Sequence, residues 1–228
     1  MEGKAAYVHS LFSAIADKYD LLNTLLSFNR DKYWRKFAVS KAGVKGGEIA
    51  LDVATGTGRL SRELAEKIGE RGKVVGIDFC EKMLYKAKSR KTNIELVLAT
   101  SESLPFPDNT FACATIGFAL RNVTDIGKTL QEMTRVIKLG GKVVCLEFAQ
   151  PRQRLFGKIH HFYLFTILPF IAGLISGQRE AYAYLPRSIV EFAKPEELKQ
   201  VMEKVGLKDV QFYPLTWGVA MVHVGTKG

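Results

Sequence analysis

The sequence predicts an α/β fold in which a mostly parallel β-sheet carries helices on both faces. From residue 48 onward, short apolar runs alternate with amphipathic stretches. Each run is almost continuously apolar, which is typical of strands buried on both faces. A glycine-rich turn also follows the first run directly. Regular alternation of strands and helices favours parallel strands joined by crossover helices.

Length and composition favour one folded domain over residues 1–228. The chain has 228 residues, of which 47% are hydrophobic and 25% charged, and a formal net charge of +10. These proportions exclude disordered and collagen-like chains. The three cysteines, Cys80, Cys113 and Cys145, cannot all pair, and two lie in apolar runs. We therefore expect buried thiols in a reducing compartment rather than a disulfide scaffold.

The first segment, residues 1–45, is expected to form a helical lid. Within residues 8–40, apolar side chains recur at three-to-four spacing, which predicts an apolar stripe along one helix. The stripe consists of Leu11, Phe12, Ile15, Tyr19 and Leu22.

The second segment, residues 46–149, is expected to be the cofactor-binding core. Its predicted strands are Ile49–Ala54, Lys73–Asp78, Ile94–Ala99, Phe111–Phe118 and Lys142–Phe148. Its predicted helices are Leu60–Ile68, Lys82–Lys88 and Ile126–Ile137. The last helix is expected to start at an N-cap in Thr124-Asp125, and the chain to leave it at Gly140-Gly141.

The third segment, residues 150–190, is an aromatic-rich insertion expected to face substrate or membrane. Its uncharged run Phe162–Ser176 is shorter than a spanning helix needs and contains Pro169. We interpret this run as a lid or a membrane-touching surface. The insertion and the N-terminal lid are expected to meet above the carboxyl ends of the strands, where open α/β sheets bind ligands.

The last segment, residues 191–228, is expected to hold a helix and a hairpin. Lys194-Pro195-Glu196-Glu197 places proline and two acids in a first helical turn. The runs Val210–Tyr213 and Val219–Val224 would then close the sheet, giving seven strands.

The turn LDVATGTGRL indicates a nucleotide-cofactor site. Gly56 and Gly58 permit a tight turn and close approach of a ligand, but several cofactors use such a turn. No Gly-Lys-Ser/Thr follows, which disfavours a P-loop, and Ser61 departs from the dinucleotide fingerprint. Asp78 ends the next strand, where an acid can bind ribose hydroxyls of NAD or S-adenosylmethionine. Asp52 could accept from the ammonium group of a methionine tail, which favours S-adenosylmethionine.

With these residues in place, the chain resembles the S-adenosylmethionine-dependent C-methyltransferases of menaquinone and ubiquinone biosynthesis, the UbiE/MenG type. The resemblance implies a Rossmann-like class I methyltransferase that methylates a ring carbon of a polyprenylated quinol, releases S-adenosylhomocysteine and uses no metal. The matching segments cover nearly the whole chain: FSAIADKYDLLNTLLSFNRDKYWRK, LDVATGTG, GIDFCEKML, SESLPFPDNTFACATIGFALRNVTD, LQEMTRVIKLGGKVVCLEF, YAYLPRSI and WGVAMVHVG.

The resemblance also implies a set of cofactor contacts. These are Asp52, Gly56, Thr57 and Gly58 at the methionine end, Asp78 at the ribose, Met83, Thr100 and Ser101 at the adenine, and Gly117 beside the sulfonium. The chain departs from the family pattern at Thr100-Ser101, where Asn-Ala is usual, and at Gly117, where Ser is usual. It also departs at Arg59, Ala112 and Ala119.

Methyl transfer to a quinol carbon requires a base or a cation that stabilises the phenolate. Arg121 and Asn122 are the best candidates for the catalytic residues, Arg121 as a permanent cation and Asn122 as an orienting group. A structural pairing of Arg121 with Glu147 is the alternative for that residue. Tyr19 and Tyr184 are expected to pack rather than to act as bases.

Other functions stay open at this point. The adjacent His160 and His161 would point apart, so no metal site is expected. The basic charge allows a nucleic-acid methyltransferase, but the aromatic residues cluster with Leu and Ile rather than with Arg and Lys, so no nucleic-acid partner is expected. An enzyme acting on another small apolar acceptor, or a lipid-binding relative without activity, are the further alternatives.

The charge distribution favours a cytoplasmic protein that contacts an anionic membrane peripherally. The N-terminus does not resemble a secretory signal. Basic residues flank the two aromatic segments: Arg152, Arg154 and Lys158 in one, and Arg30, Lys32, Arg35 and Lys36 around Tyr33 and Trp34 in the other. The sequence leaves the oligomeric state open and is compatible with a homodimer.

Overall fold

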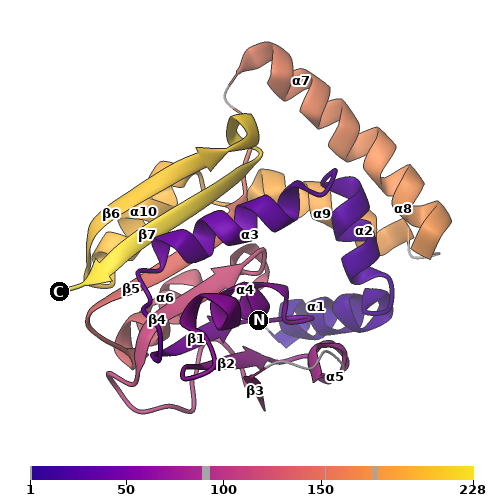
Figure 1. Ribbon diagram of the computed structural model, residues 1–228. Helices are drawn as coiled ribbons and strands as arrows, with labels where there is room; N and C mark the ends of the chain where they lie inside the picture. Colours follow the sequence, from indigo (N-terminus) through magenta and orange to yellow (C-terminus); the bar gives the residue numbers. More distant parts are fainter. Residues whose placement is uncertain (1, 89–92, 152, 177–178) are drawn as a thin grey trace.

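The computed structural model describes residues 2–88, 93–151, 153–176 and 179–228. Among these residues, one seven-stranded sheet has the order β3-β2-β1-β4-β5-β7-β6 (Figure 1). Strands β1 to β5 are parallel, whereas β7 runs antiparallel between β5 and β6. The predicted mostly parallel sheet, closed by a C-terminal hairpin, is therefore confirmed.

The strands are β1 (Ile49–Val53), β2 (Lys73–Asp78), β3 (Ile94–Leu98), β4 (Phe111–Gly117), β5 (Ile137–Phe148), β6 (Leu207–Leu215) and β7 (Ala220–Lys227). The α-helices are α1 (Glu2–Ile15), α2 (Tyr19–Leu26), α3 (Arg30–Lys41), α4 (Arg59–Ile68), α5 (Glu81–Lys88), α6 (Ile126–Val136), α7 (Arg154–Phe162), α8 (Leu168–Ser176), α9 (Arg179–Glu191) and α10 (Pro195–Lys204). Two 3₁₀ turns span Leu120–Asn122 and Thr216–Gly218, and a π-helical turn spans Tyr163–Ile167.

Helices bury both faces of the sheet. Helices α3 and α4 cover one face, where Trp34, Leu64 and Ile68 are almost completely buried against β1, β4 and β5. Helices α6 and α10 cover the other face with Leu130 and Met202. Both sides of β1 and β4 are thus packed, which explains why these strands are continuously apolar in sequence.

Helix α6 starts as expected but ends earlier. The Asp125 carboxylate accepts a hydrogen bond from the Lys128 backbone N–H at 2.9 Å, which confirms the predicted N-cap. The helix stops at Val136, and β5 already begins at Ile137, so the predicted exit at Gly140-Gly141 is wrong. The two glycines lie inside β5, where the register with β4 shifts and Gly140 has φ of 74°. They accommodate an irregularity in the strand rather than a helix end.

The N-terminal stripe lies on two helices, not on one. The chain turns between α1 and α2, so Leu11 and Ile15 belong to α1 and Leu22 to α2. All three are buried in one cluster with residues of α8 and α9, such as Ala172 and Ile189. The N-terminal helices and the 150–190 insertion therefore meet beside the carboxyl ends of the strands, as expected.

The apolar run of the insertion continues through Pro169. Helices α7 and α8 and the π-helical turn between them form a helix over Leu155–Ile175, which by its length of 21 residues and its average composition could cross a membrane. The expectation that Pro169 interrupts this run is wrong. The uncharged run itself is as short as expected, and the helix reaches its length because it begins at Leu155, before the run. The π-helical turn directly precedes α8, and its wider spacing accommodates a proline, which has no N–H. Only 17% of the apolar window is buried.

Candidate functional site

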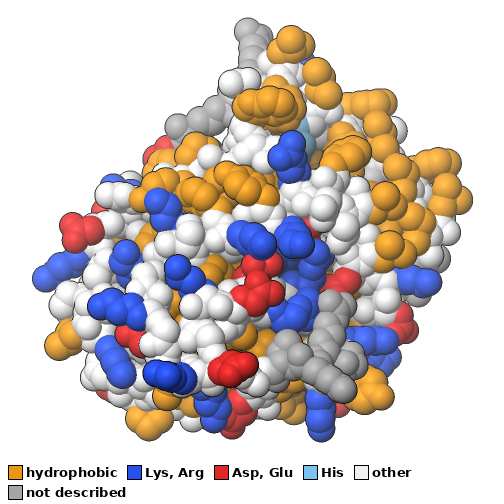
Figure 2. Space-filling model, in the orientation of Figure 1, with side chains coloured by type: hydrophobic (Ala, Val, Ile, Leu, Met, Phe, Trp, Pro, Cys, Tyr) orange, Lys and Arg blue, Asp and Glu red, His pale blue; other side chains and the backbone are white. Residues whose placement is uncertain are grey.

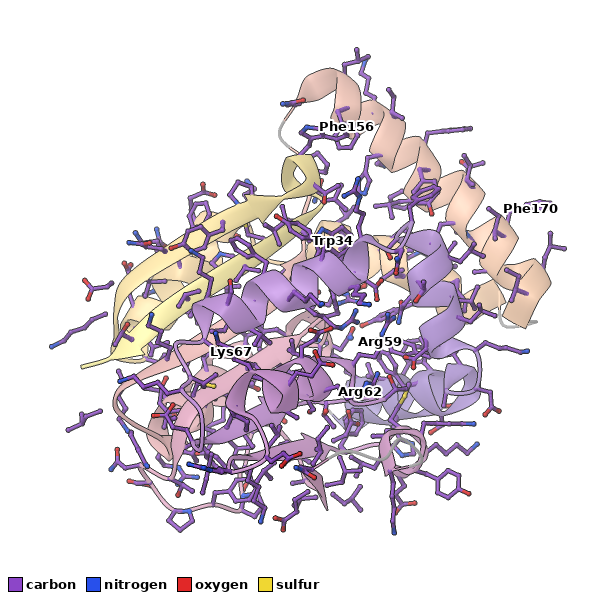
Figure 3. All side chains as sticks on the ribbon, in the orientation of Figure 1. Trp34, Arg59, Arg62, Lys67, Phe156 and Phe170 are labelled. Carbon is purple, nitrogen blue, oxygen red and sulfur yellow. The ribbon has the colours of Figure 1, made fainter. Side chains whose placement is uncertain are left out.

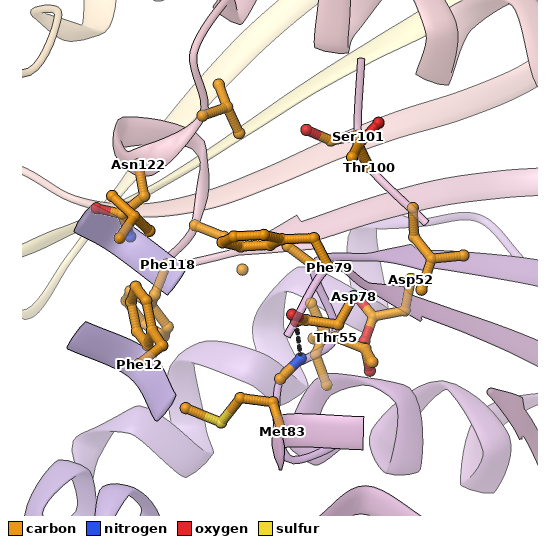
Figure 4. Close-up of a pocket in the computed structure, with 18 of the residues that line it drawn as sticks. Phe12, Asp52, Thr55, Asp78, Phe79, Met83, Thr100, Ser101, Phe118 and Asn122 are labelled. Carbon is orange, nitrogen blue, oxygen red and sulfur yellow. Dashed lines mark hydrogen bonds between the residues drawn. The ribbon is translucent and has the colours of Figure 1, made fainter. Parts of the chain in front are cut away.

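A cavity at the carboxyl ends of β1, β2 and β4 holds most of the residues singled out from the sequence (Figure 4). Those that line it are Asp52, Gly56, Thr57, Asp78, Met83, Thr100, Ser101, Gly117 and Asn122. Gly58 and Arg121 are not among its lining residues. We call this space the first cavity.

The backbone turns sharply where β1 and β4 reach the first cavity. Ala54 follows β1 with φ of 51°, and Phe118 follows β4 with φ of 59°. Both predicted strands thus end one residue early, because a left-handed residue cannot continue a strand. Left-handed conformations are uncommon for residues with a Cβ and cluster at functional sites.

Gly58 has a conformational role at this turn. It precedes α4 with φ of 76°, and a Cβ there would lie 3.3 Å from the Ala87 Cβ of α5. A side chain would therefore strain the turn and press on α5. Gly117 is crowded as well, since its added Cβ would come within 3.0 Å of Leu60 Cδ2. The departure from serine at this position fits the close approach of Leu60.

Asp52 is a buried carboxylate held by three hydroxyl groups. Its Oδ2 accepts hydrogen bonds from Thr55 Oγ1 at 2.8 Å and Ser61 Oγ at 2.6 Å, and its Oδ1 accepts one from Thr115 Oγ1 at 2.8 Å. Burial raises the pKa of Asp52. The three donors fix the orientation of this carboxyl group, which lines the first cavity.

Asp78 closes the glycine turn from the neighbouring strand. Its Oδ2 accepts the Gly56 N–H at 2.8 Å, drawn as a dashed line in Figure 4, and its Oδ1 accepts the Cys80 N–H at 2.9 Å. Burial outweighs these hydrogen bonds and raises the pKa of Asp78 to about 6. One side chain therefore orders the turn and presents a carboxylate to the cavity.

Asn122 presents a buried donor to the first cavity. Its Oδ1 accepts a hydrogen bond from the Tyr184 hydroxyl at 3.1 Å. Its Nδ2 is buried and has no hydrogen-bond partner among the described residues. Because a buried N–H without a partner is costly, this amide group indicates a place for an acceptor atom of a ligand.

Arg121 lines another cavity, which shares lining residues with the first. We call this space the second cavity. Arg121 Nη1 contacts Glu147 Oε1 at 2.5 Å and donates to the Phe118 carbonyl at 2.7 Å, while Nε donates to Ser188 Oγ at 3.2 Å. Only 6% of the Arg121 side chain is exposed and 1% of that of Glu147. The pairing with Glu147 that the sequence offered as an alternative is thus present, and the guanidinium group still lines the second cavity.

Tyr19 and Tyr184 also border the cavities. Tyr19 lines the first and the second cavity, and Tyr184 lines the second. Burial raises the pKa of both phenols, so both are protonated near neutral pH. This protonation state agrees with the expectation that neither acts as a base.

Several residues at the site were not among the site residues expected from the sequence. Thr55 and Ser61 bind Asp52, and the rings of Phe79 and Phe118 line the first cavity. Thr55 and Ser61 lie on either side of the glycine turn and close to Asp52 in sequence, so their hydrogen bonds to Asp52 could have been predicted. No local sequence pattern indicates that the rings of Phe79 and Phe118 line the cavity.

The N-terminal helices cover the first cavity and are tied to the glycine turn. Val8 and Phe12 of α1 line the cavity. Thr57 Oγ1 donates to Asp20 Oδ1 of α2 at 2.6 Å, and Arg59 pairs with Asp31 of α3 at 2.5 Å. Arg59, a departure from the family pattern, therefore joins α4 to the lid.

No group of three His, Cys, Asp or Glu side chains suited to a metal ion occurs among the described residues. Cys80, Cys113 and Cys145 are buried and free.

Comparison with known proteins agrees with this geometry. The model of the ubiE/COQ5 methyltransferase family matches residues 1–227. A ubiquinone/menaquinone biosynthesis C-methyltransferase UbiE of Geobacter sp. (strain M21) is 44% identical over 98% of this chain and 97% of its own. A demethylmenaquinone methyltransferase of Bacillus cereus is 44% identical over 99% and 98%. A solved S-adenosylmethionine-dependent methyltransferase of Thermotoga maritima shares the fold, with a TM-score of 0.71, 20% identity, and coverage of 96% of this chain and 99% of its own.

The raised pKa of Asp78 predicts that acid weakens cofactor binding. For the contact of Asp78 with the ribose that is expected from the sequence, only the ionised carboxylate can accept hydrogen bonds from both hydroxyls. Since its pKa in the free protein is about 6, affinity for S-adenosylhomocysteine should fall about tenfold for each pH unit below that value. Protonation does not itself unfold the protein, because a raised folded-state pKa means that the proton stabilises the fold as the pH falls from about 6 toward 3.8. Titration calorimetry between pH 8 and 5 measures the effect.

The matched variants are Asp78→Asn and Asp209→Asn. Asp209 is exposed and has φ of 51°, which asparagine tolerates. The first variant should bind weakly at every pH, and the second should bind as the unaltered protein does. Retention of the acid-dependent loss in Asp78→Asn would assign it to another group and contradict the prediction.

Proposed function

The chain belongs to the ubiE/COQ5 methyltransferase family and is an S-adenosylmethionine-dependent C-methyltransferase, and we propose that it methylates a ring carbon of a polyprenylated quinol in respiratory quinone biosynthesis. The main support is the 44% identity to a demethylmenaquinone methyltransferase over almost the full length of both chains. The cavities beside the glycine turn fit the same chemistry.

The residues of the first cavity suit the parts of S-adenosylmethionine. Asp78 would accept from the ribose hydroxyls, and Asp52 would attract the ammonium group near the backbone of Gly56 and Thr57. The side chain of Met83 and the hydroxyls of Thr100 and Ser101 would contact the adenine, and Gly117 would lie beside the sulfonium. The burial of Asp52 supports this order, because a buried carboxylate held only by uncharged hydroxyl groups favours a cationic partner.

The cofactor supplies an electrophilic methyl group, so the protein has to align the acceptor and exclude water. As the ring carbon bonds to the methyl group, the carbon–sulfur bond breaks and leaves S-adenosylhomocysteine, and the ring then loses the proton on that carbon. The attacking carbon is nucleophilic when an adjacent ring hydroxyl has become a phenolate. The protein therefore has to stabilise that negative oxygen.

We assign this stabilisation to Arg121 and Asn122. The free Nδ2 of Asn122 can donate to the oxygen, with the amide oriented by Tyr184. The described residues provide hydrogen bonds to Nε and Nη1 of Arg121 and none to Nη2. The remaining nitrogen can therefore donate into the second cavity. A cation in a buried site stabilises a developing phenolate more strongly than it would in water.

Methyl transfer to a quinol is the direct test of the function. The protein is incubated with methyl-labelled S-adenosylmethionine and a reduced demethylmenaquinone or a reduced demethyl benzoquinone. We expect label on a ring carbon, identified by mass spectrometry, with the oxidised quinone as a control that stays unlabelled because it cannot form a phenolate. Absence of transfer to either quinol would refute the proposal.

We further propose that the enzyme works in the cytoplasm, in peripheral contact with the membrane that holds its substrate. Exposed apolar side chains follow the helix α7–α8, visible at the upper right of Figure 2, including Leu155 at 75%, Phe170 at 60% and Leu174 at 73% exposure. Exposed apolar side chains that gather along one helix in this way are typical of a surface that contacts a membrane or another protein.

Only some of the basic residues expected to contact an anionic membrane are exposed. Arg30, Lys32, Lys36 and Lys158 are exposed, whereas Arg35 and Trp34 are buried. Trp34 packs on the sheet, and Arg35 pairs with Asp31 at 2.5 Å. Arg152 and the side chain of Arg154 lie outside the described part of the chain. The exposed cations are enough to favour an anionic surface, each contributing about 1 kcal/mol near it.

Vesicle binding should require both the charge and the apolar helix. More protein should co-sediment with vesicles that contain anionic phospholipid than with phosphatidylcholine vesicles. Leu174→Glu should lower binding to anionic vesicles at least about threefold. Leu139→Glu is the control, because Leu139 is 73% exposed but lies at the opposite end of β5 from the insertion. Equal binding to both vesicle types, or equal loss in both variants, would contradict a contact through α7–α8.

A further inference from the structure

A third cavity adjoins the second and reaches the surface of the protein. The first and second cavities share Phe12, Tyr19, Arg35 and Phe118 as lining residues. The second and third share Asn23, Ser27, Phe148 and Leu185. The third cavity has a volume of about 640 Å³. The three spaces therefore adjoin in sequence, with Arg121 beside the middle one.

The walls of the third cavity are mostly apolar, and two of the polar groups on its aromatic side chains are hydrogen-bonded within the protein. Trp34, Leu168 and Ile189 form buried parts of the lining. Trp34 Nε1 donates to Thr216 Oγ1 at 2.8 Å, and the Tyr163 hydroxyl donates to the Leu26 carbonyl at 2.7 Å. A ligand in this space thus meets mainly hydrocarbon and aromatic surface, with Asn23, Arg30 and His160 as polar members of the lining.

The third cavity opens between exposed aromatic side chains. Phe28, Tyr33 and Trp217, exposed by 76%, 51% and 69%, all line it. The rings of Phe156 and Trp217 meet edge to face, with centroids 5.1 Å apart. The cavity therefore leads from the buried second cavity to the apolar surface beside α7.

Irregular backbone borders this opening on two sides. On one side, the π-helical turn Tyr163–Ile167 provides Tyr163 and Leu164 to the lining. On the other, Thr216 and Trp217 have φ of 48° and 53° between β6 and β7. Both kinds of irregularity have a higher free energy than regular backbone. Both are also enriched at functional sites.

From this continuity we infer that the third cavity binds the isoprenoid tail of the quinol, while the ring lies in the second cavity between Arg121 and the cofactor. The inference rests on the proposed function and adds the path of the tail. The first isoprene units would lie against Phe148 and Leu185, and later units would pass Phe156 and Trp217 toward the membrane. The occupant is an uncharged branched hydrocarbon, which matches the mostly apolar walls.

Tail length provides the test. Demethyl naphthoquinols with no isoprene unit, one unit and two units are compared in detergent solution without vesicles, so that membrane binding plays no part. The ratio of kcat/KM for the two-unit homologue to kcat/KM for the tail-less one should be at least about tenfold, because burial of apolar carbon favours binding.

Two phenylalanines of one helix provide the matched variants. Phe156 lines the third cavity, whereas Phe170 is exposed near the other end of α7–α8 and lines none of the three cavities (Figure 3). Phe156→Glu should reduce the tail-length ratio to less than about threefold, and Phe170→Glu should leave it unchanged.

The two tryptophans of the chain, Trp34 and Trp217, both line the third cavity and give an optical readout. Farnesol, an isoprenoid without a quinol ring, should shift tryptophan emission to shorter wavelength and inhibit the two-unit homologue competitively. It should do neither in Phe156→Glu at the same concentration.

Three results would overturn the tail site. One is a tail-length ratio near one in the unaltered enzyme, and another is an equal reduction of the ratio in Phe156→Glu and Phe170→Glu. The third is failure of farnesol to compete. Methylation of the tail-less quinol would persist in these cases, so the proposed function would stand. Absence of methyl transfer to every homologue would refute both proposals.

Discussion

The buried ion pair between Arg121 and Glu147 is the interaction on which the arrangement of the cavities depends. It joins the loop after β4 to the end of β5, and through Ser188 it reaches α9 of the insertion. Arg121 also binds the Phe118 carbonyl and lies over the ring of Phe148, and the Phe118 and Phe148 rings are 4.5 Å apart. Phe118 lines both the first and the second cavity, and Phe148 lines both the second and the third. Loss of either charge would leave the other buried without a partner, which costs about 3–5 kcal/mol.

Buried carboxylates organise the first of these cavities. Asp52 and Asp78 lie near the carboxyl ends of neighbouring parallel strands. Asp52 is held by hydroxyl groups that follow β1, begin α4 and lie in β4, and Asp78 by backbone N–H groups of the glycine turn and of its own strand end. Burial makes both charges costly, so both carboxyl groups favour polar or cationic partners. The third cavity differs, since most of its walls are apolar. On the proposed function, the charged cofactor would bind at one end of the adjoining cavities and the hydrocarbon tail at the other, with the reacting ring between them.

The sheet could be predicted from the sequence, whereas the series of adjoining cavities could not. Strands such as Lys73–Asp78 are buried on both faces, which produces continuous apolar runs that are easy to recognise. The acids and glycines of the first cavity lie in local motifs at the ends of strands. Because parallel strands end at the same edge of a sheet, the predicted fold was enough to bring these residues together. The role of Gly58 in packing on Ala87 and the burial of Arg121 depend on contacts between distant segments. The third cavity combines residues from α2, the insertion and the hairpin turn, and no local pattern brings these together. The helix through Pro169 was missed because a π-helical turn has no sequence periodicity of its own.

A double-mutant cycle on Arg121 and Glu147, measured as kcat/KM for methyl transfer to a demethyl quinol, tests the central role of the ion pair most directly. The cycle compares the unaltered enzyme with Arg121→Gln, Glu147→Gln and the double variant at a temperature where all four are folded. Because the two residues act as a unit, each single variant should lose about 100-fold and the double variant little more than either. Losses that multiply in the double variant, or full activity in Glu147→Gln, would contradict the account.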